Sequence, residues 1–306
     1  DRARGGEGIR VQIAAALPTL LAAHQPAATG VGFGGPVDWR TGRICCSHQL
    51  AGWHDFPLGD WLRDRVHSRH AADTLGLVAD LGFAAPADEL SLLWAVQTLA
   101  ATGGLTGGRV GAGGASEDRL AGGAQGLSTR LAVRLGERVA LDRAVTAIDH
   151  GGAACRVVDA RGTTVTARVV VLAVPPPLIE RIAFAPSLPP ERRRLQAAMG
   201  LGGVIKCNAA YDRPFWRDRG SSGEAYAAHG LIRAVVDVSP PGGPAVLQAF
   251  LVGAEAQAAS RTPAPARRAA VLASLGRWFG PEAATPLDWV EHDWIADPWS
   301  AGCVGY

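Results

Sequence analysis

The chain has 306 residues, of which 30 are basic and 28 acidic, so its formal net charge is only +2. This near-neutral balance, with no basic domain, excludes the usual nucleic-acid-binding proteins, which carry a basic patch or stripe. Hydrophobic residues make up 48% of the chain and charged residues 19%, enough to bury a large core in about two domains. The sequence has no run of 18 apolar residues and therefore predicts no membrane-spanning helix.

Apolar residues at helical spacing dominate the first third of the chain. They predict helices over 9–23, over 58–81 in two pieces and over 87–101, followed by a glycine-dense loop at 103–114. Gly30, Gly32 and Gly35 formally match a dinucleotide-binding fingerprint. That fingerprint needs a strand before it and a helix after it, whereas Pro26 and Pro36 flank this run, so we attribute the match to coincidence.

The middle of the chain changes from helix to short strands. Leu127, Leu131 and Leu135 predict a helix that Gly136 ends. Runs of β-type residues follow at 139–141, 144–148, 154–158 and 163–174. The last run closes in the unbroken apolar stretch 169–174, which is typical of a strand covered on both faces, as in a parallel sheet.

The last third predicts a mixture of strands and helices of the α+β kind. A helix is expected at 191–199, a strand at 203–211, a hairpin of two strands at 231–238 and 246–252, and a helix at 266–278. Alternation along the strand 203–211 puts Lys206 and Asn208 on one face and Ile205 and Cys207 on the other.

Lys206 is the only lysine, and the other 29 basic residues are arginine. The two side chains differ mainly where a group must lose its proton or act as a compact point charge. A lone lysine between apolar neighbours either extends its ammonium group to water or is held inside a site, where burial lowers its pKa.

The cysteines and the chain ends bear on compartment and completeness. Five scattered cysteines suit free thiols better than a disulfide framework, so we expect a cytoplasmic protein, and no spacing of cysteine and histidine predicts a metal site. Met199 is the only methionine, and Asp1 opens the chain without a signal-peptide pattern. We expect both ends to be cuts within a longer protein.

Four segments in this order resemble the flavin-dependent monoamine oxidases, within the larger family of FAD-linked amine oxidoreductases. They are 122–148, the apolar run to the prolines at 169–176, the Gly-Val-Ile-Lys-Cys strand with Pro-Phe-Trp at 203–216, and Asp-Trp with Pro-Trp-Ser-x-Gly-Cys at 293–303. The third and fourth segments are the specific ones, and the likeness extends over 58–306.

The resemblance implies a mixed α/β and α+β fold. A partial FAD-binding domain, with a parallel-type strand and a helix, is interleaved with a substrate domain of helices and a mixed β-sheet. The expected substrate domain comprises 1–120, with 1–50 poorly assigned, and 196–296; the expected FAD-binding parts are 121–195 and the truncated 297–306. The sequence contains neither the family's N-terminal βαβ unit nor its C-terminal FAD segment, so it resembles an internal fragment.

The same resemblance implies a set of cofactor contacts. Lys206 would be catalytic, holding a water at flavin N5, and FAD would also contact the backbone at Val145 and Ala173. Trp294 and Trp299 would lie at the edge of the flavin ring, where core packing is the alternative role for a tryptophan. Cys303 matches the position where some members bind FAD through a thioether, although we expect noncovalent FAD.

The expected substrate-binding residues depart from the family pattern. Arg109 and Ser116 stand where mammalian-type members carry an apolar gate and a glutamine, Val304 replaces an aromatic cage residue, and Tyr306 follows two positions later. An arylalkylamine preference is therefore not implied. An arginine near the entrance suits an acidic substrate, and a solvated surface role for Arg109 stays open.

The implied activity is oxidation of a primary or secondary amine to an imine and then an aldehyde, with oxygen reduced to hydrogen peroxide. The expected partners are the amine and oxygen, with a homodimer as an option and no acid–base pair in the site. The alternatives are an amino-acid or polyamine oxidase or a desaturase, a pyridoxal phosphate Schiff base at Lys206, and a truncated, non-catalytic fragment that binds no FAD.

Overall fold

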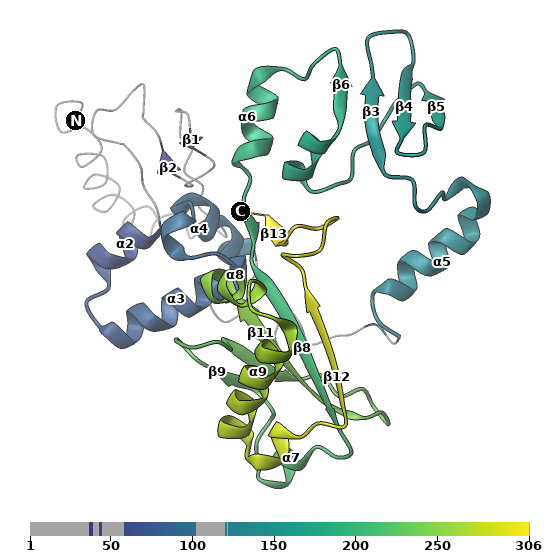
Figure 1. Ribbon diagram of the computed structural model, residues 1–306. Coiled ribbons are helices and arrows are strands. Elements are labelled where there is room, and N and C mark those ends of the chain that lie inside the picture. Colours follow the sequence, from purple (N-terminus) through teal and green to yellow (C-terminus); the bar gives the residue numbers. More distant parts are fainter. Residues whose placement is uncertain (1–36, 39–42, 45–57, 102–119, 121, 306) are drawn as a thin grey trace, which may run out of the picture.

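The computed structural model describes residues 37–38, 43–44, 58–101, 120 and 122–305. The predicted helix at 9–23 and the glycine run at 30–35 lie outside these residues. Figure 1 shows a block of helices beside a long sheet, with a second, smaller sheet at the other end of the molecule. No helix among the described residues is long and apolar enough to cross a membrane.

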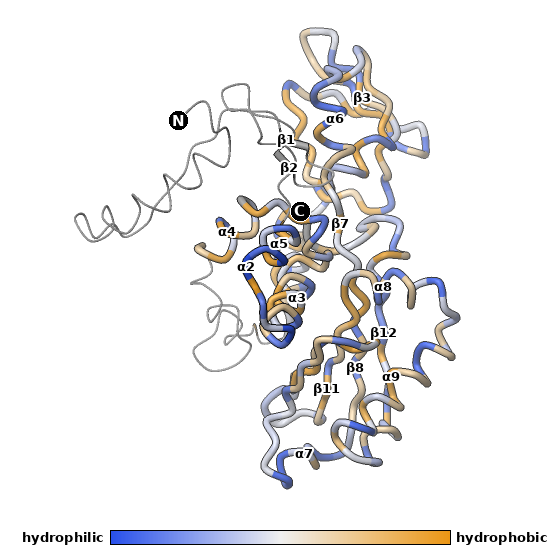
Figure 2. Tube along the Cα trace, turned by 90° about the vertical axis from the view of Figure 1, so that its left-hand side faces the viewer, coloured by the Kyte–Doolittle hydropathy of each residue, from blue (hydrophilic) through white to orange (hydrophobic). Residues whose placement is uncertain are grey.

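The helical block confirms the two-piece prediction for 58–81. It contains α2 (Leu58–Arg65), α3 (Arg69–Phe83) and α4 (Leu92–Ala101), and a two-residue antiparallel pair, β1 (Val37–Asp38) with β2 (Arg43–Ile44), precedes it. Figure 2 shows α2 as mostly hydrophilic and α4 as mostly hydrophobic.

The prediction that one helix begins at Ala87 is wrong. A short 3-10 turn, η2 (Ala87–Glu89), is followed by an extended residue at Leu90, and α4 begins only at Leu92. Leu90 is fully buried, and its carbonyl accepts a hydrogen bond of 2.8 Å from the backbone N–H of Leu58. This tertiary contact replaces the helical bonding that the local pattern favours.

The smaller sheet lies above α5 (Gln125–Leu135) in Figure 1 and has the strand order β5-β4-β3-β6. Its strands are β3 (Val145–Asp149), β4 (Cys155–Asp159), β5 (Thr164–Ala167) and β6 (Ala183–Ala185). The first three pair antiparallel, and β6 pairs parallel with β3. Short 3-10 turns η3 (Gly136–Arg138) and η4 (Pro176–Arg181) and helix α6 (Pro190–Ala198) complete this part.

One predicted strand in this region is wrong and another is only partly confirmed. Residues 139–141 form no strand, and Leu141 is 77% exposed. The strand predicted at 163–174 is confirmed in its first part as β5, whereas the run 169–174 forms no strand, and Val169 and Val171 are 75% and 84% exposed. An apolar run becomes a central strand only where neighbouring strands and covering layers exist, and the described residues supply neither.

The longer sheet is antiparallel throughout, with the strand order β12-β8-β11-β10-β9. The strands are β8 (Val204–Tyr211), β9 (Ala225–Tyr226), β10 (Ala234–Asp237), β11 (Ala245–Val252) and β12 (Asp288–Asp293). The predicted hairpin is confirmed as β10 and β11. The predicted alternation is also confirmed, since Ile205 and Cys207 are fully buried and Lys206 is half-buried.

Helices α8 (Gly253–Ser260) and α9 (Ala264–Phe279) cover the Ile205 face of this sheet. The core between them includes Leu247, Leu251, Val271 and Leu275. Helix α7 (Phe215–Asp218), placed where the Pro-Phe-Trp motif occurs, adds the buried Trp216, and η5 (Pro281–Ala284) follows α9. Figure 2 shows the resulting hydrophobic stretches along β8 and β11.

A close junction joins α3, β8 and the end of the described chain. Strand β7 (Leu201–Gly202) pairs with β13 (Cys303–Gly305) just before β8 begins. A Cβ on Gly202 would lie 2.5 Å from the Cβ of Ala84 and 2.8 Å from the carbonyl oxygen of Cys303. Only glycine therefore lets these three segments approach one another without a shift.

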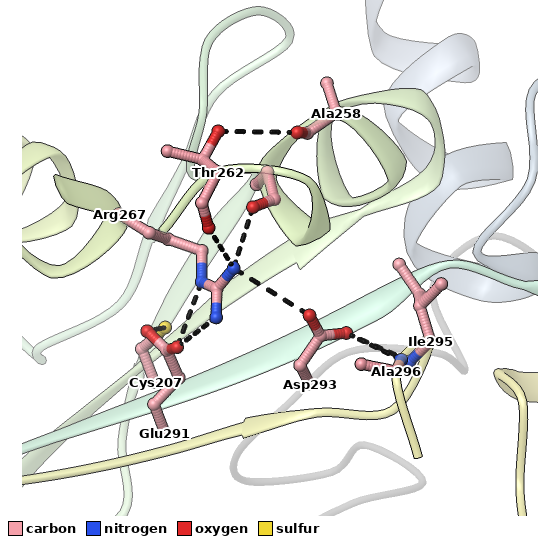
Figure 3. A network of polar contacts seen from close by, with 9 residues as sticks. Cys207, Ala258, Thr262, Arg267, Glu291, Asp293, Ile295 and Ala296 are labelled. Carbon is pink, nitrogen blue, oxygen red and sulfur yellow. Dashed lines mark hydrogen bonds and ion pairs between the residues drawn. The ribbon is translucent and has the colours of Figure 1, made fainter. Parts of the chain in front are cut away.

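A buried polar network fixes β12 to α9 (Figure 3). Arg267, which is 7% exposed, donates hydrogen bonds of 2.9 and 2.5 Å to Glu291 and lies 3.8 Å from Asp293. It also donates to the carbonyls of Ala259 and Thr262, at 2.7 and 3.0 Å. Because one guanidinium group satisfies two carboxylates and a turn, it ties the helices α8 and α9 to the edge strand.

We predict that Arg267→Met lowers the free energy of unfolding of the full-length protein by about 3–5 kcal/mol, because it leaves two buried carboxylates without their cation. Arg267→Met combined with Glu291→Leu should recover part of this loss. Arg194→Met is the matched control: Arg194 pairs with Glu191 at 3.2 Å, both are mostly exposed, and about 0–1 kcal/mol is expected. Equal losses for Arg267 and Arg194 in urea unfolding would contradict the role of the network.

Candidate cofactor and active site

Lys206 is the third residue of β8, on the sheet face opposite α9. Its cross-strand partners are Phe250 in β11 and His292 in β12. The ammonium nitrogen lies 5.5 Å from the centroid of the Phe250 ring, within the range of a cation–π contact. Within the part of the chain that the structure describes, the Lys206 side chain makes neither an ion pair nor a hydrogen bond, so its three donors are available to a ligand or water.

Trp294 follows β12 directly and lies at the end of the same sheet face. Its backbone N–H donates to the carbonyl of Val204 at 3.1 Å, and its side chain packs against the cluster of Ala84, Val204 and Val252. The indole nitrogen of Trp294 is buried and has no hydrogen-bond partner among the residues that the structure describes. Since buried polar groups are almost always paired, an unpaired indole N–H at this position marks a place for a polar ligand atom.

Cys303 lies near Lys206 and Trp294, in the same apolar cluster as Trp294. It lies in β13, opposite Gly202, and packs against the same apolar cluster as Trp294 and Phe250. Phe250 packs against the same cluster and also lies under the Lys206 ammonium group, so Lys206 lies beside this cluster. The structure brings these three expected cofactor contacts together at one end of the long sheet.

The loop from Trp294 to Ser300 is shaped by two aspartates. Asp293 accepts hydrogen bonds from the backbone N–H groups of Ile295 and Ala296, at 3.0 and 3.2 Å. Asp297 accepts from Trp299 and Ser300, at 2.8 and 2.9 Å, and these bonds hold the pKa of its carboxyl group below the usual range. These local bonds fix the backbone of the loop.

A second group of expected contacts lines a cavity of about 330 Å³ beside the smaller sheet. Val145, Ala173 and Trp299 all border it, and most of the other lining residues are apolar: Ile148, Val157, Val170, Val171, Leu172, Val174, Leu178 and Ile182. Arg181 of η4 also lines the cavity and donates to the carbonyl of Pro298. The loop therefore begins with Trp294 at the long sheet and reaches this cavity five residues later, at Trp299.

These features fit a flavin dinucleotide. An apolar cavity accommodates aromatic rings, while the buried indole N–H of Trp294 and the unpaired ammonium group of Lys206 offer donors to polar ring atoms. Cys207 lies on the opposite face of β8, where its thiol donates to Glu291. Burial raises the pKa of this thiol, so Cys207 is a neutral thiol of the core.

Three of the four expected substrate-binding residues, Arg109, Ser116 and Tyr306, lie outside the described residues. The fourth, Val304, lies in β13 directly after Cys303. Their expected role in substrate binding stays a prediction.

Sequence reasoning missed Phe250 and His292. Their only signal in the sequence is their position in strands that pair with β8, and the partner strand of a lysine cannot be read from local periodicity. Asp297 was missed for a related reason, because its contact with His292 depends on the loop geometry.

Comparisons with known proteins identify the family of the chain. A family model described as flavin-containing amine oxidoreductase matches residues 14–306. Putrescine oxidase of Kocuria rosea is 36% identical over 255 residues, covering 79% of this chain and 53% of that protein. A Mycobacterium tuberculosis protein named as a flavin-containing monoamine oxidase is 34% identical over 249 residues, covering 81% and 54%.

A solved structure of cyclohexylamine oxidase from Brevibacterium oxydans has a TM-score of 0.78 at 26% identity, over 88% of this chain and 60% of its own. The chain spans about half the length of the curated relatives it matches. Since the family model covers nearly all of the sequence, the chain belongs to the flavin-containing amine oxidoreductase family.

Proposed function

We propose that the full-length protein carrying this chain is an FAD-dependent amine oxidase of the monoamine oxidase type. It oxidises a primary or secondary amine to an imine, which hydrolyses to an aldehyde, and reduces oxygen to hydrogen peroxide. The observation that carries this proposal is the position of Lys206 near the start of β8. Its ammonium group lies over Phe250, which packs against the same apolar cluster as Trp294 and Cys303.

Two groups of residues hold FAD in this proposal. Val145, Ala173 and Trp299 contact it at the apolar cavity, and Lys206 and Trp294 contact it at the end of the long sheet. FAD, when bound, supplies the acceptor for the hydride of the amine and the route of electrons to oxygen. The domain boundaries follow: 121–195 and 297–306 belong to the FAD-binding domain, and 1–120 and 196–296 to the substrate domain.

Lys206 holds and orients a water molecule through the N–H donors of its ammonium group. The Phe250 ring beneath it stabilises the charge, since a cation over an aromatic face is attracted by the ring quadrupole. An arginine at this position would present a planar fork instead of a compact point charge. The apolar cluster beside Lys206 keeps bulk water away and strengthens each polar contact there.

The substrate class is an aliphatic or cyclic amine in this proposal. A putrescine oxidase and a cyclohexylamine oxidase are among the similar proteins. A diamine or polyamine oxidase is the second candidate, supported by the 36% identity to putrescine oxidase. The unpaired thiols of Cys155, Cys207 and Cys303 support a reducing, cytoplasmic compartment.

The purified full-length protein should show flavin absorption near about 370 and 450 nm, and it should release hydrogen peroxide and ammonia from a primary amine. A panel of monoamines and diamines then separates the two candidates by their kcat/KM. A protein that gives a pyridoxal-type spectrum, or binds flavin but yields no peroxide from any amine, would overturn the proposal.

We predict that Lys206→Met keeps FAD bound but slows the restoration of flavin absorbance by oxygen. The loss of a charged hydrogen-bond donor is worth about 1.5–3 kcal/mol, or roughly 10- to 100-fold in rate. Arg268→Met is the matched control, because Arg268 lies 5.6 Å over the Trp289 ring on the opposite sheet face. Stopped-flow rates equal to wild type for Lys206→Met would remove Lys206 from the mechanism.

We further predict that FAD is noncovalent. Acid precipitation of the full-length protein should leave the flavin in the supernatant, both for wild type and for Cys303→Ala. Flavin that stays with the wild-type pellet but is released from Cys303→Ala would instead show a thioether at Cys303.

A further inference from the structure

His292 lies next to Lys206 on the same face of the long sheet. The register of β12 with β8 pairs the two residues directly. Paired residues of antiparallel strands project from the same face, with their Cβ atoms about 4.5–5.5 Å apart. The His292 side chain is 49% exposed, so the imidazole is accessible to a small molecule that approaches Lys206.

Two contacts orient the His292 ring. Its Nε2 atom lies 3.6 Å from a carboxylate oxygen of Asp297, and its ring meets Trp294 edge-on with centroids 4.2 Å apart. The other oxygen of Asp297 accepts the backbone N–H groups of Trp299 and Ser300, so the carboxylate is itself held in place. A base oriented by a fixed carboxylate is the arrangement that enzymes use for proton transfer.

Among the described residues, the charged groups near His292 come from β8, from β12 itself and from the loop that follows β12. From β8 the imidazole faces Lys206, from the loop it faces Asp297, and Asp288 lies on the same face further along β12. Strand β11 contributes only uncharged residues to this face: Val246, Gln248, Phe250 and Val252. Glu291 and Asp293 belong to the opposite face, where Arg267 binds both.

The chemistry of amine oxidation supplies a use for such a base. An alkylamine is an ammonium ion near neutral pH, and it must lose a proton before the carbon beside it can release a hydride. Histidine is the side chain best suited to accept that proton in the physiological range.

We propose that His292, oriented by Asp297, is the group that deprotonates the substrate ammonium. One N–H bond of the ammonium breaks and an N–H bond forms at Nδ1 of His292, which leaves a neutral amine and an imidazolium stabilised by Asp297. The imidazolium then returns the proton to water. This inference rests on the proposed function and adds a catalytic residue to it.

The test uses the FAD-loaded full-length enzyme and the pH dependence of kcat/KM. His292→Gln should lower kcat/KM roughly 10²-fold at pH 7. The deficit should vanish at a pH above the ionisation of the amine, and for a fluorinated amine that is already neutral at pH 7. A merely structural role would produce the same deficit at every pH and with both amines, which would overturn the inference.

Two further variants sharpen the result. Asp297→Asn keeps an oxygen for the backbone N–H groups but removes the charge, and it should shift the pH profile in the same direction as His292→Gln. His229→Gln is the matched control, because His229 pairs with Asp73 at 3.3 Å on α3, and its profile should equal that of wild type.

The outcomes separate this inference from the proposed function. If the wild-type enzyme oxidises amines and His292→Gln keeps its full kcat/KM at pH 7, the role of His292 is contradicted and the proposed function is not. Wild-type enzyme that carries FAD but oxidises no amine overturns the proposed function, and the role of His292 with it. Equal flavin absorbance per protein in all variants verifies that the substitutions leave the fold intact.

Discussion

The pairing of β8 with β11 and β12 determines which side chains enter the core and which reach the candidate site. It places Ile205 and Cys207 in the core against α9 and presents Lys206 between Phe250 and His292 on the other face. A slip of one residue would exchange these faces, bury the ammonium group and expose the core. The buried guanidinium of Arg267 opposes such a slip at the edge strand, because Glu291 and Asp293 must both face it.

The candidate site depends on that pairing and on one close junction. Gly202 lets β13, β7 and the end of α3 meet where β8 begins, and this brings Cys303 to the cluster around Trp294. The loop fixed by Asp293 and Asp297 then carries the chain from the long sheet to the cavity at the smaller one. Its two ends hold tryptophans that the family resemblance assigns to a single cofactor.

Sequence patterns predicted the elements that depend mainly on the spacing of apolar residues and on turn residues. The two-piece helix at 58–81, the alternation around Lys206 and the amphipathic helix α9 are confirmed, because spacing and turn residues suffice for them. The apolar run at 169–174 was misassigned since a covered strand depends on partners elsewhere in the chain. His292 was missed for the same kind of reason, because only the register of β12 reveals its position beside Lys206.

We propose that one flavin lies against both groups of residues, with its reactive ring at the Lys206 face. A crystal structure of the flavin-loaded full-length protein would show the position of this ring. We expect ring density in contact with Trp294 and within one water of the Lys206 ammonium nitrogen, and the rest of the cofactor at the cavity lined by Val145 and Ala173. Flavin density away from Lys206 would contradict it.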